Sequence, residues 1–186
     1  MAGSTKDSLM QAAVRLFAAK GIDGTTTREI AAAAGVTEGA IYRHFVGKEA
    51  LVEEIFHRHY LPFAAELDAA RGTAEGAEAE LRAVVRRVYA AFDRDRDLFA
   101  FLLLAQHGPM RRIADGAATP VRVIEKLVRA GQRAGTIRRM DARLATQIVL
   151  GAVLQPATGS LYGEVSPPLI AIADQVAEAA WRAIAG

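Results

Sequence analysis

Hydrophobic positions recur along the chain with the period of an α-helix. The stripe from Leu9 to Phe17 has the spacing i, i+4, i+7 and i+8, which predicts an amphipathic helix over residues 5–20. A second stripe covers residues 81–92 with the same period. Residues 98–104 are apolar throughout, so periodicity cannot separate a buried helix from a strand there. Because no neighbouring segment predicts a partner strand, we expect a helix.

Start and stop signals divide the rest of the chain into further helices. Thr26 and Glu29 have the spacing of a capping box, and this short helix is expected to end at Gly35. Thr37 suits the N-cap of the next helix. Later helices are expected to begin at Thr119-Pro120, Asp141 and Ser166-Pro167.

These elements predict an all-α fold with two parts. An N-terminal unit of three helices with a helix-turn-helix is expected over residues 1–47, and a larger C-terminal helical unit over residues 48–186. The family resemblance described below implies that the first is a DNA-binding domain and the second a ligand-binding and dimerisation domain. The second part should begin with a connecting helix over about residues 48–70, which Pro62 is expected to kink or break. The segment RGTAEGAEA, residues 71–79, is the expected hinge between two units.

Composition narrows the class of protein. Hydrophobic residues make up 52% of the 186 residues, which favours a well-filled interior. The absence of cysteine excludes disulfides and thiolate metal sites, and the N-terminus does not resemble a signal peptide. The apolar stretch Leu144–Leu161 is interrupted by Gln147, Gln155 and Pro156, so we expect no membrane span. A cytoplasmic protein is the expectation.

Bulk charge does not indicate a nucleic-acid partner. The net charge is +2, and residues 1–60 hold seven basic and seven acidic side chains, which cancel. An interaction with DNA would therefore have to depend on the arrangement of particular residues.

No catalytic, cofactor or metal pattern emerges. Gly47-Lys48 lacks the remaining residues of a phosphate-binding loop. His57 and His59 point about 200° apart on a helix, which is unsuitable for a shared metal ion. Glu53 and His57 share a face, but a solvated contact explains that spacing. We expect no enzyme activity, no cofactor and no metal.

The third short helix has an unusual distribution of side chains. At about 100° per residue, Ile41 and Phe45 face the first two helices, and Gly39 and Arg43 face away. Ala40 and Tyr42 are expected to flank that outward side. Small residues at the leading turn would let the helix enter the major groove of DNA, which is about 12 Å wide. Tyr42, Arg43 and His44 could then reach the sugar-phosphate walls.

Other residues of this segment suggest finer roles. Arg28 could contact guanine O6 and N7 in a bidentate manner, or have a simple surface role beside Glu29. Backbone N–H groups near Thr26, Thr27 and Lys48 are candidate phosphate ligands. Glu38 could accept a hydrogen bond from a cytosine amino group, or only favour the helix N-terminus through the macrodipole.

Residues 21–56, GIDGTTTREIAAAAGVTEGAIYRHFVGKEALVEEIF, resemble the DNA-binding domain of TetR-family transcriptional regulators. The features that carry the resemblance are Gly21-x-x-Gly24, Thr26-Thr27 before Ile30-Ala31, Ala34-Gly35-Val36, and Ile41-Tyr42-x-x-Phe45 followed by Lys48-Glu49-x-Leu51. The resemblance implies a homodimer with three N-terminal helices, a connecting fourth helix and a helical ligand-binding domain. It also implies DNA contacts at Thr27, Arg28, Thr37, Gly39, Ala40, Tyr42, His44 and Lys48.

Small residues in the last helices suggest a dimer surface, because they permit close approach of two helices. The candidates are Ala145, Gly151, Ala152, Ala173, Ala177, Ala180 and the anchor Trp181. The alternative is that these residues pack within one subunit.

Polar residues in apolar surroundings suggest a small-molecule site. The candidates are Tyr89, Gln106, His107, Gln147 and Gln155. The expected function is that of a transcriptional repressor released from a palindromic double-stranded DNA operator by a small-molecule effector. The alternative is a helical protein that binds or sequesters a small molecule without binding DNA.

Overall fold

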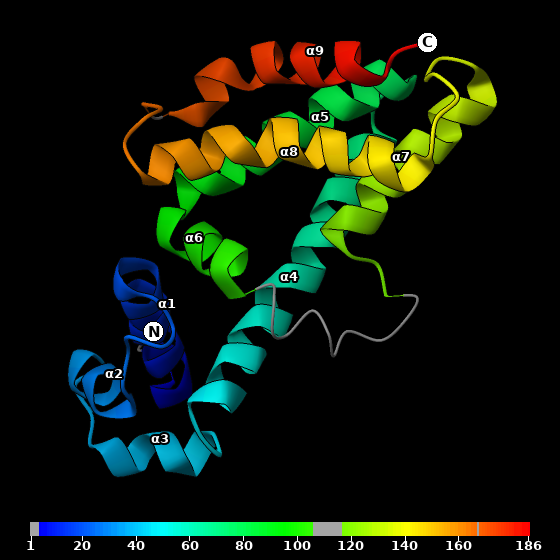
Figure 1. Cartoon of the computed structure of the whole chain (residues 1–186). Coiled ribbons are helices and arrows are strands. Elements are labelled where there is room, and N and C mark those ends of the chain that lie inside the picture. The colour runs from blue at the N-terminus through cyan, green and yellow to red at the C-terminus, as the bar shows by residue number, and fades with distance from the viewer. Residues whose placement is uncertain (1–3, 106–116, 167) are drawn as a thin grey trace. The chain divides into compact units, whose positions relative to one another are not determined.

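The computed structural model describes residues 4–105, 117–166 and 168–186, and within them the fold is all-α (Figure 1). This confirms the fold class that the sequence predicts. The N-terminal helices are α1 (Thr5–Lys20), α2 (Thr27–Ala33), α3 (Glu38–His44) and α4 (Lys48–Gly72). They are followed by α5 (Ala77–Arg94), α6 (Arg96–Ala105), α7 (Pro120–Ala134), α8 (Ala142–Leu161), the 3-10 helix η2 (Leu169–Ile172) and α9 (Ala173–Ile184).

The chain forms two compact units. In unit 1 the described residues are 4–60 and 95–105, and in unit 2 they are 61–94, 117–166 and 168–186. Unit 1 therefore holds α1, α2, α3, the first half of α4, and α6. Unit 2 holds the second half of α4 with α5, α7, α8 and α9.

The core of unit 1 forms where α1 packs against α2, α3 and α6. Leu9 and Phe17 of α1 are fully buried, as the spacing of apolar residues predicts. The ring of Phe17 stacks on that of Phe101 from α6, with 5.7 Å between the ring centroids. The uniformly apolar segment 98–104 is thus part of a helix, and its aromatic residues fill this core.

The caps predicted at Thr26, Thr119 and Asp141 are present, whereas Thr37 makes no side-chain cap bond at the start of α3. Thr26 accepts a hydrogen bond from the backbone N–H of Glu29, and the Glu29 carboxylate accepts one from that of Thr26, so the capping box is complete. Thr119 accepts from the N–H of Arg122 to cap α7, and Asp141 accepts from that of Leu144 to cap α8. These bonds satisfy N–H groups that have no partner within the helix.

At Pro62 the structure excludes a helix break, one of the two predicted effects, and at Ser166 it shows no start of an α-helix. Helix α4 continues from Lys48 to Gly72 with Pro62 inside it, so the proline does not break the helix (Figure 1). The last helix does not begin at Ser166: the 3-10 helix intervenes, and α9 starts at Ala173. Pro167 lies outside the described residues.

The carboxylate of Asp93 explains the delayed start of α9. It accepts hydrogen bonds from the backbone N–H groups of Leu169 and Ile170, at 2.8 and 2.9 Å. Asp93 thereby holds the 3-10 helix against the end of α5.

Unit 2 is a helical layer in which α9 packs against both α5 and α8, and α8 also packs against α7 (Figure 1). Leu81, Tyr89 and Leu127 are fully buried in its core. A Cβ atom added to Gly131 would meet the side chain of Ile137 at 2.5 Å. The absence of a side chain at Gly131 thus leaves the space that the Ile137 side chain occupies against α7.

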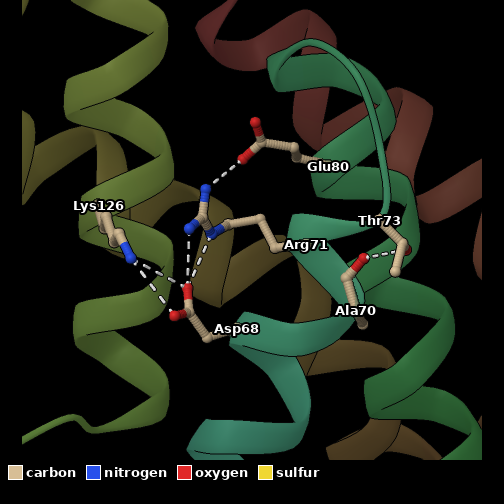
Figure 2. A network of polar contacts seen from close by, with 6 residues as sticks. All are labelled: Asp68, Ala70, Arg71, Thr73, Glu80 and Lys126. Atoms are coloured by element: carbon tan, nitrogen blue, oxygen red, sulfur yellow. Dashed lines mark hydrogen bonds and ion pairs between the residues drawn. The ribbon is translucent and has the colours of Figure 1, made fainter.

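An ion-pair network joins three helices of unit 2 (Figure 2). The Arg71 guanidinium near the end of α4 donates to Glu80 of α5 at 2.7 Å and to Asp68 at 2.9 Å. Asp68 also accepts from Lys126 of α7 at 3.3 Å. The hydrogen bond from Arg71, and then that from Lys126, lowers the pKa of Asp68. The segment 71–79 therefore lies inside unit 2, where this network bridges it.

Helix α8 is long and apolar enough to cross a membrane by length and composition alone. A core helix of a water-soluble fold passes the same test, and α8 packs against α7 and α9.

Candidate DNA-binding interface

The turn between α2 and α3 is tight, which places two short helices at a fixed angle. Gly35 has a φ of 69°, in the left-handed region that favours glycine. The next residue, Val36, donates its backbone N–H to the carbonyl of Ala31 at 3.0 Å. This hydrogen bond closes α2 immediately before α3 begins.

Helix α3 presents the outward face that the sequence predicts. Ile41 is fully buried and Phe45 is 6% exposed, whereas Gly39 and Arg43 are exposed. A Cβ atom added to Gly39 would meet nothing within 4 Å, so the space beside the leading turn is open. The exposed ridge that a groove-binding helix requires is therefore present in unit 1.

Ala40 differs from expectation because its side chain is 6% exposed rather than outward-facing. Ala40 precedes the fully buried Ile41 and lies about 100° from it around the helix axis. Its small methyl group is therefore covered together with Ile41. Its side chain is closed off from an outside partner in this structure. Tyr42, on the other flank, is 57% exposed as expected.

The remaining predicted side chains of this face are open to solvent. Thr37, Glu38 and His44 are exposed, as is Arg28 on α2. Val46, directly after α3, is 95% exposed and is not among the predicted contacts. An apolar residue next to Phe45 could equally belong to the core, so the sequence pattern does not predict that Val46 is exposed.

Thr27 links the start of α2 to α3. Its hydroxyl donates to a carboxylate oxygen of Glu38 at 2.8 Å. The hydroxyl of Tyr42 lies 3.5 Å from the same Thr27 oxygen, which is a weak contact. Three residues predicted to bind DNA therefore meet at one point on the exposed surface.

The capping box fixes the start of α2. Lys20 forms an ion pair with Glu29, whose carboxylate also accepts from Thr26. These bonds, that from Lys20 first, lower the pKa of Glu29 to about 2. The side chain of Thr26 is therefore occupied in holding the helix start.

Lys48 is bonded to the protein itself. Its ammonium group donates to the carbonyl oxygens of Ile22 at 2.8 Å and Thr25 at 3.1 Å. The side chain therefore secures the α1–α2 connection to the start of α4.

The predicted small-molecule residues do not come together. Tyr89 is fully buried and donates its hydroxyl proton to the carbonyl oxygen of Val153 at 3.0 Å, and burial raises its pKa to about 12. Gln147 and Gln155 lie on the exposed face of α8, away from that core position. Gln106 and His107 lie outside the described residues. The prediction of one pocket lined by these side chains is therefore not supported.

Most of the predicted dimer residues pack within the subunit. Ala145, Ala173, Ala177 and Ala180 are at most 2% exposed, because they form the contact between helices of unit 2. Gly151 is exposed, and Ala152 and Trp181 are half-buried. The alternative of packing inside one subunit therefore applies to the four alanines.

Among the residues that the structure describes, no three His, Asp or Glu side chains lie close enough to hold a metal ion.

A tight turn between two short helices, the second with an exposed face and small residues at its first turn, is typical of helix-turn-helix DNA-binding domains. Residues 9–55 match the family model of bacterial regulatory proteins, tetR family. The match extends from α1 to the first half of α4, so the N-terminal part of the chain is similar to this family.

Curated relatives match the same region. The transcriptional repressor KstR2 of Mycolicibacterium smegmatis is 46% identical over 52 residues, which is 28% of this chain and 25% of the repressor. KstR2 of Rhodococcus jostii is 33% identical over 95 residues, or 51% of this chain and 47% of that protein. The aligned segments thus span a quarter and about half of the lengths of these relatives.

Solved structures share the whole fold. The fatty acid degradation regulator FadR of Bacillus halodurans has a TM-score of 0.81 and 23% identity, covering 97% of this chain and 96% of that one. FadR of Bacillus subtilis, solved in complex with stearoyl-CoA, has a TM-score of 0.75 and 20% identity, covering 94% and 96%. At this identity the likeness concerns the fold alone.

Proposed function

We propose that the protein is a dimeric transcriptional repressor that binds operator DNA through α3 and leaves it when a small molecule binds unit 2. The observation that carries the proposal is the outward face of α3. Gly39 leaves space at the leading turn, Arg43 and Tyr42 extend outward, and Ile41 anchors the opposite side in the core. This arrangement suits entry into the major groove with flanking phosphate contacts.

A second copy of the chain is the proposed occupant of the exposed face of α8. Leu144 is 55% exposed and Tyr162 is 79% exposed at the two ends of this face, with exposed Gly151 and Gln155 between them. Their spacing of 7, 4 and 7 residues follows the helical period, so they form one stripe. A stripe of exposed, uncharged residues with a large apolar side chain at each end suits a helix–helix contact between subunits. Two copies would present two α3 helices to the two halves of a palindromic operator.

The effector is proposed to be an amphipathic molecule with a long apolar part. The helices of unit 2 pack their apolar faces around a core that contains Leu81, Tyr89 and Leu127. The related fold of Bacillus subtilis FadR was solved with stearoyl-CoA. Stearoyl-CoA is therefore the first effector to test.

The test is selection of DNA from a randomised duplex pool, followed by affinity measurements over a range of salt concentrations. We expect a two-fold symmetric sequence, with half-sites about 34–36 Å apart, and a steep loss of affinity with salt. Arg43→Ala combined with Tyr42→Phe should weaken binding to all sequences and flatten the salt slope. Arg129→Ala, which removes a positive charge from α7 in unit 2, serves as the control.

Failure to select any sequence would refute DNA binding and favour the small-molecule-binding alternative. Stearoyl-CoA should lower the affinity for the selected DNA, by roughly 5- to 150-fold for a coupling of ordinary size. An unchanged affinity at saturating stearoyl-CoA would reject this effector class.

A further inference from the structure

Glu38 is the one acidic residue of α3, and it lies on the face proposed to enter DNA. A carboxylate near phosphates is unfavourable unless it finds a hydrogen-bond donor, because both groups are negative and only accept hydrogen bonds. The position of Glu38 therefore requires an explanation beyond general affinity for DNA.

In the structure a hydrogen bond, and not an ion pair, holds this carboxylate in place. One of its oxygens accepts the Thr27 hydroxyl proton at 2.8 Å. In the part of the chain that the structure describes, Glu38 forms no ion pair with a basic side chain. The N-cap residue Thr37 makes no side-chain cap bond, so Glu38 is not part of a capping box at the start of α3.

The neighbours of Glu38 leave it accessible from outside. Gly39 has no side chain, and even an added Cβ atom there would meet nothing within 4 Å. The Thr27 hydroxyl has a single proton, which Glu38 receives, so Tyr42 is the donor in its weak 3.5 Å contact with Thr27. Glu38 is itself exposed and its hydrogen bond to Thr27 uses only Oε1, so its second carboxylate oxygen is accessible to a donor from a partner.

The major groove offers two kinds of amino donor, cytosine N4 and adenine N6. Adenine carries the acceptor N7 beside its amino group, and this lone pair repels a carboxylate. Cytosine has no ring acceptor on that edge, so a carboxylate pairs with it more favourably. Guanine and thymine present acceptors, which an acidic side chain rejects.

We infer that Glu38 determines operator specificity by accepting a hydrogen bond from a cytosine amino group, and that Thr27 is the positioning residue that aims its carboxylate. This inference rests on the proposed DNA-binding function. It assigns one base of each half-site, which phosphate contacts made by neighbouring residues cannot do.

The experiment compares the base preferences of full-length variants, using selection from a randomised duplex and binding to a panel of single-base changes. Glu38→Gln should move the preferred base from cytosine to adenine at one position in each half-site, because an amide matches the donor and acceptor of adenine. The change in relative affinity should be about 5- to 150-fold. Glu49→Gln, which removes the same charge from an exposed position in the first turn of α4, should keep cytosine.

Thr27→Val tests the positioning role, because it removes the hydroxyl while nearly preserving the shape of the side chain. It should reduce the discrimination against adenine several-fold while cytosine stays preferred, and Thr27→Ser should restore the discrimination. A purely structural role of Thr27 would weaken binding to all bases equally.

The possible outcomes separate this inference from the proposed function. If the unchanged protein selects an operator and Glu38→Gln keeps every base preference, the cytosine contact is rejected and DNA binding stands. If the unchanged protein selects no sequence, both proposals are rejected together.

Discussion

The ammonium nitrogen of Lys48 lies 2.8 Å from the carbonyl oxygen of Ile22, across the gap between the start of α4 and the α1–α2 connection. A second bond, to the carbonyl oxygen of Thr25, uses another of its three protons. Family resemblance alone suggests a phosphate ligand at this position. The observed bonds indicate that Lys48 instead sets the position of the segment that leads into α2.

Replacement of Lys48 by Met should therefore reduce the stability of unit 1. Two backbone carbonyls lose a charged donor, and hydrogen bonds of this type contribute about 1–3 kcal/mol. DNA affinity should fall for all sequences, because α2 and α3 are less well held. The slope of log affinity against log salt concentration should stay unchanged. A slope smaller in magnitude by about one would show that Lys48 neutralises a phosphate.

The cap of α2 offers a matched pair of substitutions. Thr26→Ala removes the side chain that accepts from the N–H of Glu29, and should lower the free energy of unfolding by about 1 kcal/mol. Thr37→Ala alters the N-cap of α3, where no side-chain cap bond exists, so a much smaller loss is expected. Urea unfolding followed by circular dichroism measures both. Equal losses would contradict the role assigned to the capping box.

The network around Arg71 predicts a coupled effect on unit 2 (Figure 2). The side chains of Arg71 and Glu80 are 14% and 18% exposed, so removal of one leaves the other poorly solvated. Arg71→Met or Glu80→Gln should each cost about 1–3 kcal/mol, with a combined cost below the sum. Glu78→Gln, at the more exposed Arg82–Glu78 pair, should cost less than about 1 kcal/mol. Additive losses at Arg71 and Glu80 would show that the two side chains act independently.

Much of unit 1 could be predicted from the sequence because its signals are local. The capping box at Thr26 and the glycine at residue 35 act through bonds and backbone angles that the nearby residues specify. The faces of α3 follow from the helical period and the apolar pair Ile41 and Phe45. The same period predicts a partly outward position for Ala40, which is buried. Alanine is small and occurs both in the core and on the surface, so its identity does not indicate burial at the edge of the apolar face.

The errors in unit 2 share a physical cause. Close packing of alanines stabilises a contact between helices of one subunit as well as one between subunits, so the sequence could not decide for Ala145 or Ala177. A glutamine within an apolar segment can face a pocket or solvent, and Gln147 and Gln155 face solvent. Whether such a residue faces another helix, a pocket or solvent depends on where the neighbouring helices lie, which the local sequence does not specify.

The exposed face of α8 can be tested at Gly151. A Cβ atom added there meets nothing within 4 Å and the position is exposed, so Gly151→Glu should leave the monomer folded. At the proposed contact between two copies, however, it places two negative charges close together. We expect monomers by sedimentation velocity and weaker operator binding. Arg122→Glu, an exposed change on α7, is the control, and a persistent Gly151→Glu dimer would exclude this face.

Tyr89 links the core of unit 2 to a measurable dependence on pH. Burial raises its pKa from 10.0 to about 12, so the folded state holds the phenolic proton more tightly than the unfolded state. Its contribution to stability is complete below pH 10 and is lost as pH rises from 10 through 12. Burial also raises the pKa of Tyr60 to about 12, so two residues contribute to this alkaline loss.

Tyr89→Phe should cost about 1 kcal/mol at neutral pH, because the hydrogen bond to the carbonyl oxygen of Val153 is lost. Between pH 10 and 12 the variant should lose less stability than the unchanged protein, since one of the two buried phenols no longer ionises. Urea unfolding at a series of pH values measures the difference. Tyr162→Phe, at a side chain that is 79% exposed, should follow the unchanged protein. An identical alkaline loss in Tyr89→Phe would show that the phenol of Tyr89 ionises alike in the folded and unfolded states.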